Sequence, residues 1–585
     1  MAVYLPDEQN YIDKLTEIVE ENYSNPSFGV AELAREMGLS HSSLHRKLKT
    51  IARQSISQFI RETRLKRAME LLRLQAGTVS EIAFGVGFGS TTYFSKCFHD
   101  YYGYPPGEVK KRYVSDSPSG RKFKGDLGTP VKQIRSIAIL PFDNYTGDES
   151  QDFLVFGIHD ALIGELGELT SLRVVSKTSV LTFSKSEKTI KQIASELEVD
   201  AIIEAAVLFV DGKIRIQLKL FKTFPEEKQL LAQTFDVEMG NILNLYSQVI
   251  RKIASEIQLT LSPRQENQIA ERREVNSECY KAYLRGKYNL YKLTEEGMKK
   301  GLVYLHEAVR IDPAEPFAYA ALALGYMEIA HGPLNPGDAC IKAEWASREA
   351  LKLGPDLAET QLALAELCIY YTWQFEEGEM YFKRALEINP NLSLAHYHYS
   401  WLLYLLGRNE EAINEHELAQ RCDPFNPMIT AFTGALYGYV GRYEDAIQEA
   451  RKSFDIQKDC PDGYYVLGET YLAMGKENEA IAAHKKLAEV DPVWKWWYGY
   501  MLAITNHHDE AKKVLNVLLN EAMTSWKAMG IAVIYGALGQ LDEAWEWIAL
   551  KPAHAWIPWI ACMPMWKPLY NDPRFDEFVN QLNLP

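Results

Sequence analysis

The sequence predicts a multidomain, mainly α-helical chain with an all-α double helix-turn-helix head, a small α/β middle domain and a C-terminal α-solenoid. Three observations support this fold class. Residues 1–114 contain a helix–glycine–helix pattern twice, residues 135–262 alternate strand-like runs with helical stretches, and residues 275–585 repeat a helical pattern. Residues 115–134 are rich in Ser, Gly, Pro and Lys, which is typical of a linker.

The distribution of charged residues also separates the head from the rest of the chain. Residues 1–135 hold 20 Lys and Arg against 15 Asp and Glu, whereas the remaining residues hold 43 against 63. The net charge of −15 argues against a protein that coats nucleic acid along its whole length. A basic head on an acidic body predicts that only the head contacts nucleic acid.

Cysteine usage and hydropathy indicate the compartment. Seven cysteines occur without a CxxC pair, and this odd count favours reduced thiols over a disulfide framework. The acidic N-terminus does not resemble a signal peptide, and the longest apolar run, 201–210, is too short to span a bilayer. We therefore expect a cytoplasmic protein with no membrane partner.

The first helix-turn-helix unit is predicted from residues 30–50. Apolar residues at 30, 33, 34 and 37 form one helical face, which Gly38 ends, and Ser40 is a good N-cap for a helix over 41–50. The second helix of such a unit lies in the major groove of DNA. The exposed side of that helix is expected to present His41, Ser42, His45, Arg46 and Lys49.

The same pattern recurs from residue 79. Apolar positions 79, 82, 83 and 86 precede the break at Gly87, and Ser90 caps a helix over 91–102 with outward residues Thr91, Thr92, Ser95 and Lys96. A long helix over 57–74 is expected to join the two units. Residues 40–67 carry eight Lys and Arg and one acid, a density typical of phosphate contacts.

Residues 10–113 resemble the AraC/XylS-type DNA-binding domain. The resemblance is carried by Leu33-Ala34, Gly38-Leu39-Ser40, Leu44, Arg46, Arg64-Leu65, Ala68, Leu71-Leu72, Ile82-Ala83, Gly87-Phe88, Tyr93-Phe94, Lys96, Phe98, Gly103 and Pro105-Pro106. It implies two recognition helices in successive major grooves, with base-facing positions at Ser42, Arg46, Thr92 and Lys96. The sequence departs from the family pattern at turns and at the domain edge, namely at Arg53, Ile56, Val109 and Lys110.

We predict DNA contacts from Ser42, His45, Arg46, Lys49, Thr91, Thr92 and Lys96. The alternative, for each of these except Arg46, is a solvated helix face. His41 and His45 lie one helical turn apart, but no third ligand is near in sequence, so DNA-facing side chains are favoured over a metal site. The Gly85, Gly87 and Gly89 motif follows a helix and not a strand, which argues against a dinucleotide site. No catalytic residue, cofactor or metal is expected.

The middle region is predicted to be a small mixed sheet with helices. Strands are expected at 134–142, 172–176, 201–209, 213–222 and 229–238, with helices at 152–169, 190–197 and 241–261 and a type I′ turn at Asp211-Gly212. Residues 135–261 resemble the TolB-like amino-terminal domain through Ile137–Phe142, Phe156-Gly157, Leu172–Ser176 and Leu197–Ile202, which implies a fold but no reaction. The polar residues Asp143, Asn144, Asp148 and Asp152 could surround a ligand or metal pocket, but turn chemistry is the favoured explanation.

The tail resembles tetratricopeptide repeats. Helix-ending prolines at 313, 355, 390, 424, 461 and 492 scatter about the ~34-residue period of this family, and small residues mark close helix approaches. We expect seven to eight repeats whose concave face binds a protein or peptide, closed by a capping end at 568–585. Most tryptophans are expected in the core. However, two clusters suggest an aromatic binding surface: Trp494, Trp496 and Trp497, and then Trp556, Trp559 and Trp566.

The leading hypothesis is a sequence-specific bacterial transcription regulator, an activator by resemblance, that senses a protein, peptide or small-molecule signal through its middle and repeat regions. One alternative is an interaction scaffold with a residual DNA-binding unit, which the basic run and both capped helices argue against. The other is an enzyme acting on a nucleotide, for which the sequence offers no phosphate loop, nucleophile elbow or metal-ligand spacing. A homodimer stays open, because tandem half-sites are common for such regulators, although no coiled-coil seam is present.

Overall fold

The computed structural model divides the chain into two compact units, Met1–Pro130 and Val131–Pro585. From residue 134 onward the structure describes all residues except 211–212, 225, 269–272, 332–337, 551–553, 583 and 585. Before residue 134 it describes 14–15, 18–19, 22, 28–39, 43–44, 47–48, 56–73, 79–88, 94, 97–98 and 106. The predicted linker therefore falls almost entirely outside the described residues, and the Asp211-Gly212 turn lies outside them.

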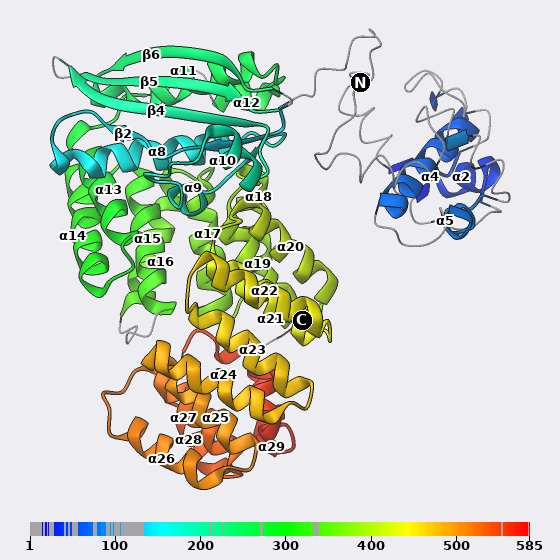
Figure 1. The fold of residues 1–585 in the computed structure, drawn as a ribbon, viewed down its shortest axis with the longest axis vertical. Coiled ribbons are helices and arrows are strands. Elements are labelled where there is room, and N and C mark those ends of the chain that lie inside the picture. Colours follow the sequence, from blue (N-terminus) through cyan, green and yellow to red (C-terminus); the bar gives the residue numbers. More distant parts are fainter. Residues whose placement is uncertain are drawn as a thin grey trace. The chain divides into compact units, whose positions relative to one another are not determined.

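The head contains the helices α2 (Val30–Glu36), α4 (Ile56–Arg73) and α5 (Val79–Gly85) (Figure 1). Helix α4 is the predicted long connector, and it contributes to two separate cores. Its first half packs with the first helix-turn-helix unit through Ile56, Phe59, Ile60, Leu33, Leu44 and Leu48. Its second half packs with the second unit through Leu65, Ala68, Met69, Leu72, Ile82, Phe94 and Phe98.

Both units end their first helix with the same glycine turn. Gly38 has φ +64° and Gly87 has φ +79°, in the left-handed region where a side chain costs about 1–2 kcal/mol. After each glycine the next backbone N–H returns to the helix: Leu39 donates to the Ala34 carbonyl at 2.9 Å, and Phe88 donates to the Ala83 carbonyl at 3.0 Å. The predicted breaks after both helices are thus confirmed.

The second unit begins with a mixed sheet. The strands are β1 (Ser136–Ile139), β2 (Asp143–Asn144), β3 (Arg173–Val174), β4 (Ala201–Val210), β5 (Lys213–Lys222) and β6 (Lys228–Val237). Their order in the sheet is β3-β1-β4-β5-β6, and the short β2 also pairs with β4. Strand β1 is parallel to β3 and β4, whereas β4, β5 and β6 are antiparallel neighbours. All five predicted strands are confirmed.

Alternation along the strands assigns each sheet face to its helices. Ile137 and Ile139 pack with α8 (Asp152–Gly167) and α11 (Ile242–Glu256), whereas Ala138 packs with α9 (Lys177–Leu181) and α10 (Ile190–Glu196). The polar residues after β1 form a turn: the Asn144 amide donates to Asp152 Oδ1 at 2.6 Å, and Asp148 accepts from the Ser150 N–H at 2.9 Å. These contacts favour turn chemistry over a ligand pocket.

The short α12 (Pro263–Gln268) leads into the solenoid, in which each odd-numbered helix packs against the even-numbered helix that follows it. The helices are α13 (Ser277–Leu290), α14 (Glu295–Ile311), α15 (Pro316–His331), α16 (Ala339–Leu353), α17 (Ala358–Leu367), α18 (Phe375–Ile388), α19 (Ser393–Leu405), α20 (Asn409–Cys422), α21 (Pro427–Tyr439), α22 (Tyr443–Ile456), α23 (Pro461–Ala473), α24 (Glu477–Val490), α25 (Lys495–Ile504), α26 (His508–Leu519), α27 (Ser525–Ala537) and α28 (Leu541–Ile548). This is the predicted repeat architecture.

The C-terminal segment folds back on the solenoid. It consists of the 3-10 helices η6 (Ile557–Ala561) and η7 (Pro564–Leu569) and helix α29 (Pro573–Gln581). Helix η7 packs on α27 near the end of the solenoid, but η6 packs on α19, where the Trp559 indole N–H donates to the Trp401 carbonyl at 3.1 Å. The expected capping end at 568–585 contains α29 and the end of η7, whereas η6, which precedes it, joins repeats that are distant in sequence.

The sheet and the solenoid are joined by partly buried polar contacts. The Asp160 carboxylate of α8 binds Lys177 Nζ at 2.6 Å and Lys287 Nζ at 2.5 Å, and these two ammonium groups hold its pKa well below the usual range. Asn391, before α19, donates to the Gly167 and Leu172 carbonyls at 2.8 and 2.9 Å. Among the described residues, no helix combines the length and apolar character that a membrane span requires.

Candidate functional site

All seven predicted DNA-contact residues lie outside the described residues: Ser42, His45, Arg46, Lys49, Thr91, Thr92 and Lys96. The inward positions of the same two segments are described. Leu44 and Leu48 are fully buried in one core, and Phe94 and Phe98 are fully buried in the other. Burial at positions four apart is what the two predicted recognition helices require. The DNA-contact roles of the seven residues remain predictions.

One arginine of the basic stretch has a role in the fold. The Arg64 guanidinium of α4 donates to the Phe28 carbonyl at 3.1 Å and ties the connector helix to the segment before α2. Partial burial lowers the pKa of this guanidinium. In contrast, Lys47 and Arg67 are exposed. Sequence reasoning assigned the whole stretch to phosphate contacts and did not separate Arg64 from the others.

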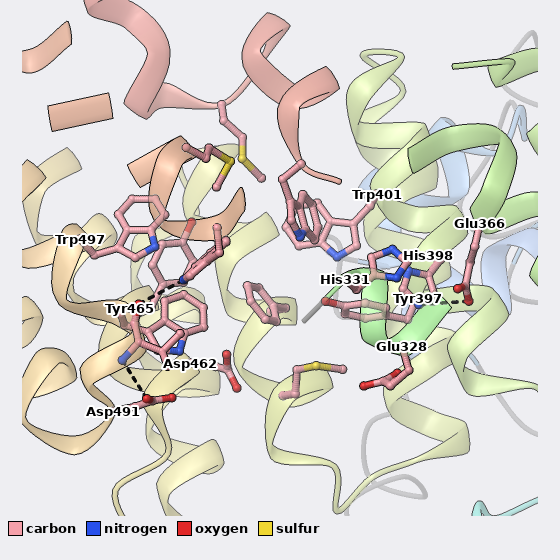
Figure 2. Close-up of a pocket in the computed structure, with 18 of the residues that line it drawn as sticks. Glu328, His331, Glu366, Tyr397, His398, Trp401, Asp462, Tyr465, Asp491 and Trp497 are labelled. Carbon is pink, nitrogen blue, oxygen red and sulfur yellow. Dashed lines mark hydrogen bonds and ion pairs between the residues drawn. The ribbon is translucent and has the colours of Figure 1, made fainter. Parts of the chain in front are cut away.

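A second candidate site is a cavity of about 420 Å³ inside the solenoid. This volume lies within the range of small-molecule sites. Its walls come from the first helices of successive pairs, from the turn before α25 and from the returning C-terminal segment. Figure 2 shows Asp462 and Asp491 beside Tyr465 and Trp497 on one side, and Glu328 and Glu366 beside His331 and His398 on the other.

One wall of the cavity is aromatic. The Tyr465 ring lies 4.7 Å from that of Trp497, 5.9 Å from that of Trp494 and 5.9 Å from that of Phe432, measured between centroids. The Trp526 ring continues this wall at 5.3 Å from Trp494. The rings touch in tilted and edge-on arrangements, which are the favoured geometries of aromatic pairs.

The charged residues of the cavity are all acidic. Among the described residues, four carboxylates line it, from Glu328, Glu366, Asp462 and Asp491, and no Lys or Arg does. Burial raises the pKa of Asp462 to about 6, raises that of Glu328, and raises that of Glu366 well above its usual range. Glu328 faces the cavity space and is accessible there, but the surrounding protein still desolvates its carboxylate.

The histidines of the cavity do not supply a countercharge. Burial lowers the pKa of His331 to about 4 and that of His398 well below its usual range, so both are neutral at pH 7. His398 Nδ1 lies 2.8 Å from the Tyr370 hydroxyl, and His398 Nε2 lies 3.5 Å from Glu366. Among the described residues, His331 Nε2 and the Trp497 indole N–H have no hydrogen-bond partner.

The two predicted tryptophan clusters divide between this cavity and the core. Trp494, Trp497 and Trp556 line the cavity. In contrast, Trp496, Trp559 and Trp566 are at most 1% exposed, so the hypothesis of a binding surface is wrong for these three. The four acids were not predicted as a site, because they come from different repeats. Acidic residues on the inner faces of the first helices are the signal that could have revealed them.

Family models match two parts of the chain. Residues 33–112 match the model of a helix-turn-helix domain, and residues 461–493 match that of a tetratricopeptide repeat. The first match covers the head, including both glycine turns, and the second begins at the first residue of α23.

Curated relatives are similar over parts of their length. The transcriptional regulator HilA of Salmonella typhimurium is 24% identical over 55% of this chain and 56% of that protein. The HTH-type transcriptional regulator GadX of Shigella flexneri is 27% identical over 20% of this chain and 47% of that protein. The putative adenylate cyclase 3 of Rhizobium meliloti is 26% identical over 32% of each chain. The chain thus spans about a third to about half the length of these relatives.

A solved structure with similarity to this chain is PilW, a type IV pilus biogenesis factor. It is 19% identical and covers 43% of this chain and 97% of that chain, with a TM-score of 0.28. Together, the family models identify a helix-turn-helix domain in the head and a tetratricopeptide repeat in the solenoid.

Proposed function

We propose that this chain is a sequence-specific DNA-binding transcription regulator. The match to a helix-turn-helix domain over residues 33–112 is the main support for this proposal, and the two similar glycine turns in the head add to it. The similarity to HilA and GadX, both named as transcriptional regulators, points in the same direction. Activation is the direction that the resemblance to the AraC/XylS type favours.

In this proposal the head contacts DNA through Ser42, His45, Arg46 and Lys49 of one helix and through Thr91, Thr92 and Lys96 of the other. Arginine suits the bidentate reading of guanine, and lysine suits either guanine or phosphate. Because the head carries the basic excess of the chain, it also supplies the sequence-independent attraction to the phosphate backbone.

The remaining regions receive the signal in this proposal. Residues 135–262 form a TolB-like domain and residues 275–585 a solenoid that takes a protein, peptide or small molecule. The cavity supports a small-molecule input, because it lies inside the solenoid and has its own polar and aromatic lining. We also propose that the chain binds tandem DNA half-sites as a homodimer.

The test is binding of the full chain to genomic fragments at near-physiological salt. We expect enrichment of a few promoters by the wild type and its loss in the Arg46→Ala, Lys96→Ala double variant, since each good base contact contributes about 1–3 kcal/mol. The matched control is Arg451→Ala, Lys485→Ala, which removes the same charges from exposed positions of the solenoid. Equal, unselective binding by all three proteins would overturn the proposal.

A further inference from the structure

We propose that the solenoid cavity binds a small organic cation, in which an ammonium group is attached to an apolar body. The role of this cation as the signal rests on the proposed function, whereas its binding to the cavity does not depend on that function. Three properties of the lining residues support this inference: their charge, their aromatic rings and their polar atoms without hydrogen-bond partners.

The charges of the lining select for a positive ligand. Four carboxylates face a space that no Lys or Arg lines in the part of the chain that the structure describes, and its histidines are neutral. Glu328 has no ion pair or hydrogen bond among the described residues. The thiol of Cys460 lies 3.9 Å from Asp462, and Glu366 has only the neutral His398 at 3.5 Å. Carboxylates without a countercharge are costly inside a protein, so an ammonium group bound there supplies what the lining lacks.

The aromatic wall selects for the same charge. A cation within about 6 Å of a ring face is attracted by the ring quadrupole, and Trp is the strongest partner. Tyr465 and Trp497 provide such rings beside Asp462 and Asp491 (Figure 2). Trp494 and Trp526 also line the cavity and extend this aromatic wall. The sulfurs of Met428, Met529, Met563 and Met565 and the remaining rings offer contact for an apolar body.

Other ligand classes fit this lining less well. Phosphates and carboxylates would meet four acidic groups with no basic partner. A neutral apolar ligand would leave those acids without a countercharge, although the Asp491 carboxylate accepts a hydrogen bond from the Val493 N–H at 3.1 Å. The cavity volume of about 420 Å³ suits a molecule of drug size or smaller. The Trp497 indole N–H, on a side chain that is 4% exposed, adds an unused donor for a hydroxyl or carbonyl on the ligand body.

The experiment compares cations with neutral molecules of the same shape, using the intrinsic tryptophan fluorescence of the full chain and calorimetry. One pair is choline and 3,3-dimethylbutan-1-ol, and the other is 2-phenylethylammonium and 2-phenylethanol. We expect the better cation to bind at least about tenfold more tightly than its neutral partner, and to quench tryptophan emission. Equal affinity within both pairs, or no binding of either cation, would overturn the proposal.

Two variants separate charge from shape. Asp462→Asn and Glu328→Gln remove a negative charge without changing the size of the side chain, and each is expected to weaken cation binding several-fold without weakening that of the neutral partner. Asp509→Asn is the matched control, because Asp462 and Asp509 both lie in the first turn of a solenoid helix but Asp509 is exposed outside the cavity. Equal losses for both members of a pair would contradict a charge-specific site. Because this assay contains no DNA, its failure is distinct from a failure of the proposed function.

Discussion

At the scale of single residues, Asp462 is a group whose ionisation matters near neutral pH. Burial raises the pKa of its carboxyl to about 6, and Asp491 adds to this by repulsion. The other titratable groups that act on it are neutral at this pH: the pKa of the Cys460 thiol is raised, and so is that of the Tyr397 hydroxyl. Asp462 therefore changes from mostly neutral to mostly ionised between pH 5 and 7.

We expect cation affinity to rise with pH through this window. Below about pH 6 the neutral carboxyl predominates in the empty protein, whereas the cation binds the ionised form, so affinity increases by up to about tenfold from pH 5 to 7. Titration of choline or 2-phenylethylammonium into the wild type and Asp462→Asn at both pH values measures this change. A steep rise that persists in Asp462→Asn would assign the titration to Glu328 or Glu366 instead.

At the scale of secondary-structure elements, helix α8 shows how the sheet and the solenoid are packed together. A Cβ built on Gly157 would lie 2.6 Å from Leu284 Cδ2 of α13, whereas a Cβ on Gly164 of the same helix meets nothing within 4 Å. Leu284 is buried, so it has little room to move. The two glycines therefore offer a matched comparison within one helix.

We predict opposite effects of alanine at these positions. Gly157→Ala should lower the free energy of unfolding by about 1–3 kcal/mol, because the added methyl group overpacks the contact with α13. Gly164→Ala should raise it by about 0.5–1 kcal/mol, because alanine loses less backbone entropy in a helix. Urea titrations followed by circular dichroism compare the two variants, and a stabilising Gly157→Ala would mean that α8 and α13 are not in close contact.

Strands and turns could be predicted from the sequence better than the cavity could, for a physical reason. The strand at 134–142 follows from its apolar residues, and the turns at Gly38 and Gly87 follow from the φ that only glycine adopts easily. These are local properties of the chain. That Glu328 and Asp462 line the same cavity depends on how successive repeats curve and on where the C-terminal segment returns. For the same reason, Trp496 was expected on a binding surface, but it packs against Gly530 in the core.

At the scale of the Val131–Pro585 unit, helix α19 connects the cavity lining with the returning C-terminal segment and with helix α8 next to the sheet. It contributes His398 and Trp401 to the lining, and it accepts the Trp559 indole N–H of the returning segment. Asn391, two residues before α19, holds the end of α8. The cavity is therefore connected to the sheet through one helix and its flanking residues.

We expect Trp559→Phe to loosen this connection. The substitution removes the hydrogen bond to the Trp401 carbonyl and part of a fully buried ring, so amide exchange in α19 should accelerate and cation affinity should fall. Hydrogen–deuterium exchange of the full chain measures the first effect and fluorescence titration the second. Trp566→Phe is the control, since Trp566 is equally buried in the same segment but makes no hydrogen bond through its indole. Equal exchange in both variants would contradict a special role for Trp559.

The return of the C-terminal segment also sets an order during synthesis. A ribosome makes the head before it makes Trp556, Met563 and Met565, which complete the cavity lining. Under the proposed function, a nascent chain gains its DNA-binding part long before its ligand site exists. A prematurely terminated product would then occupy operators without responding to ligand, and it would compete with the full regulator.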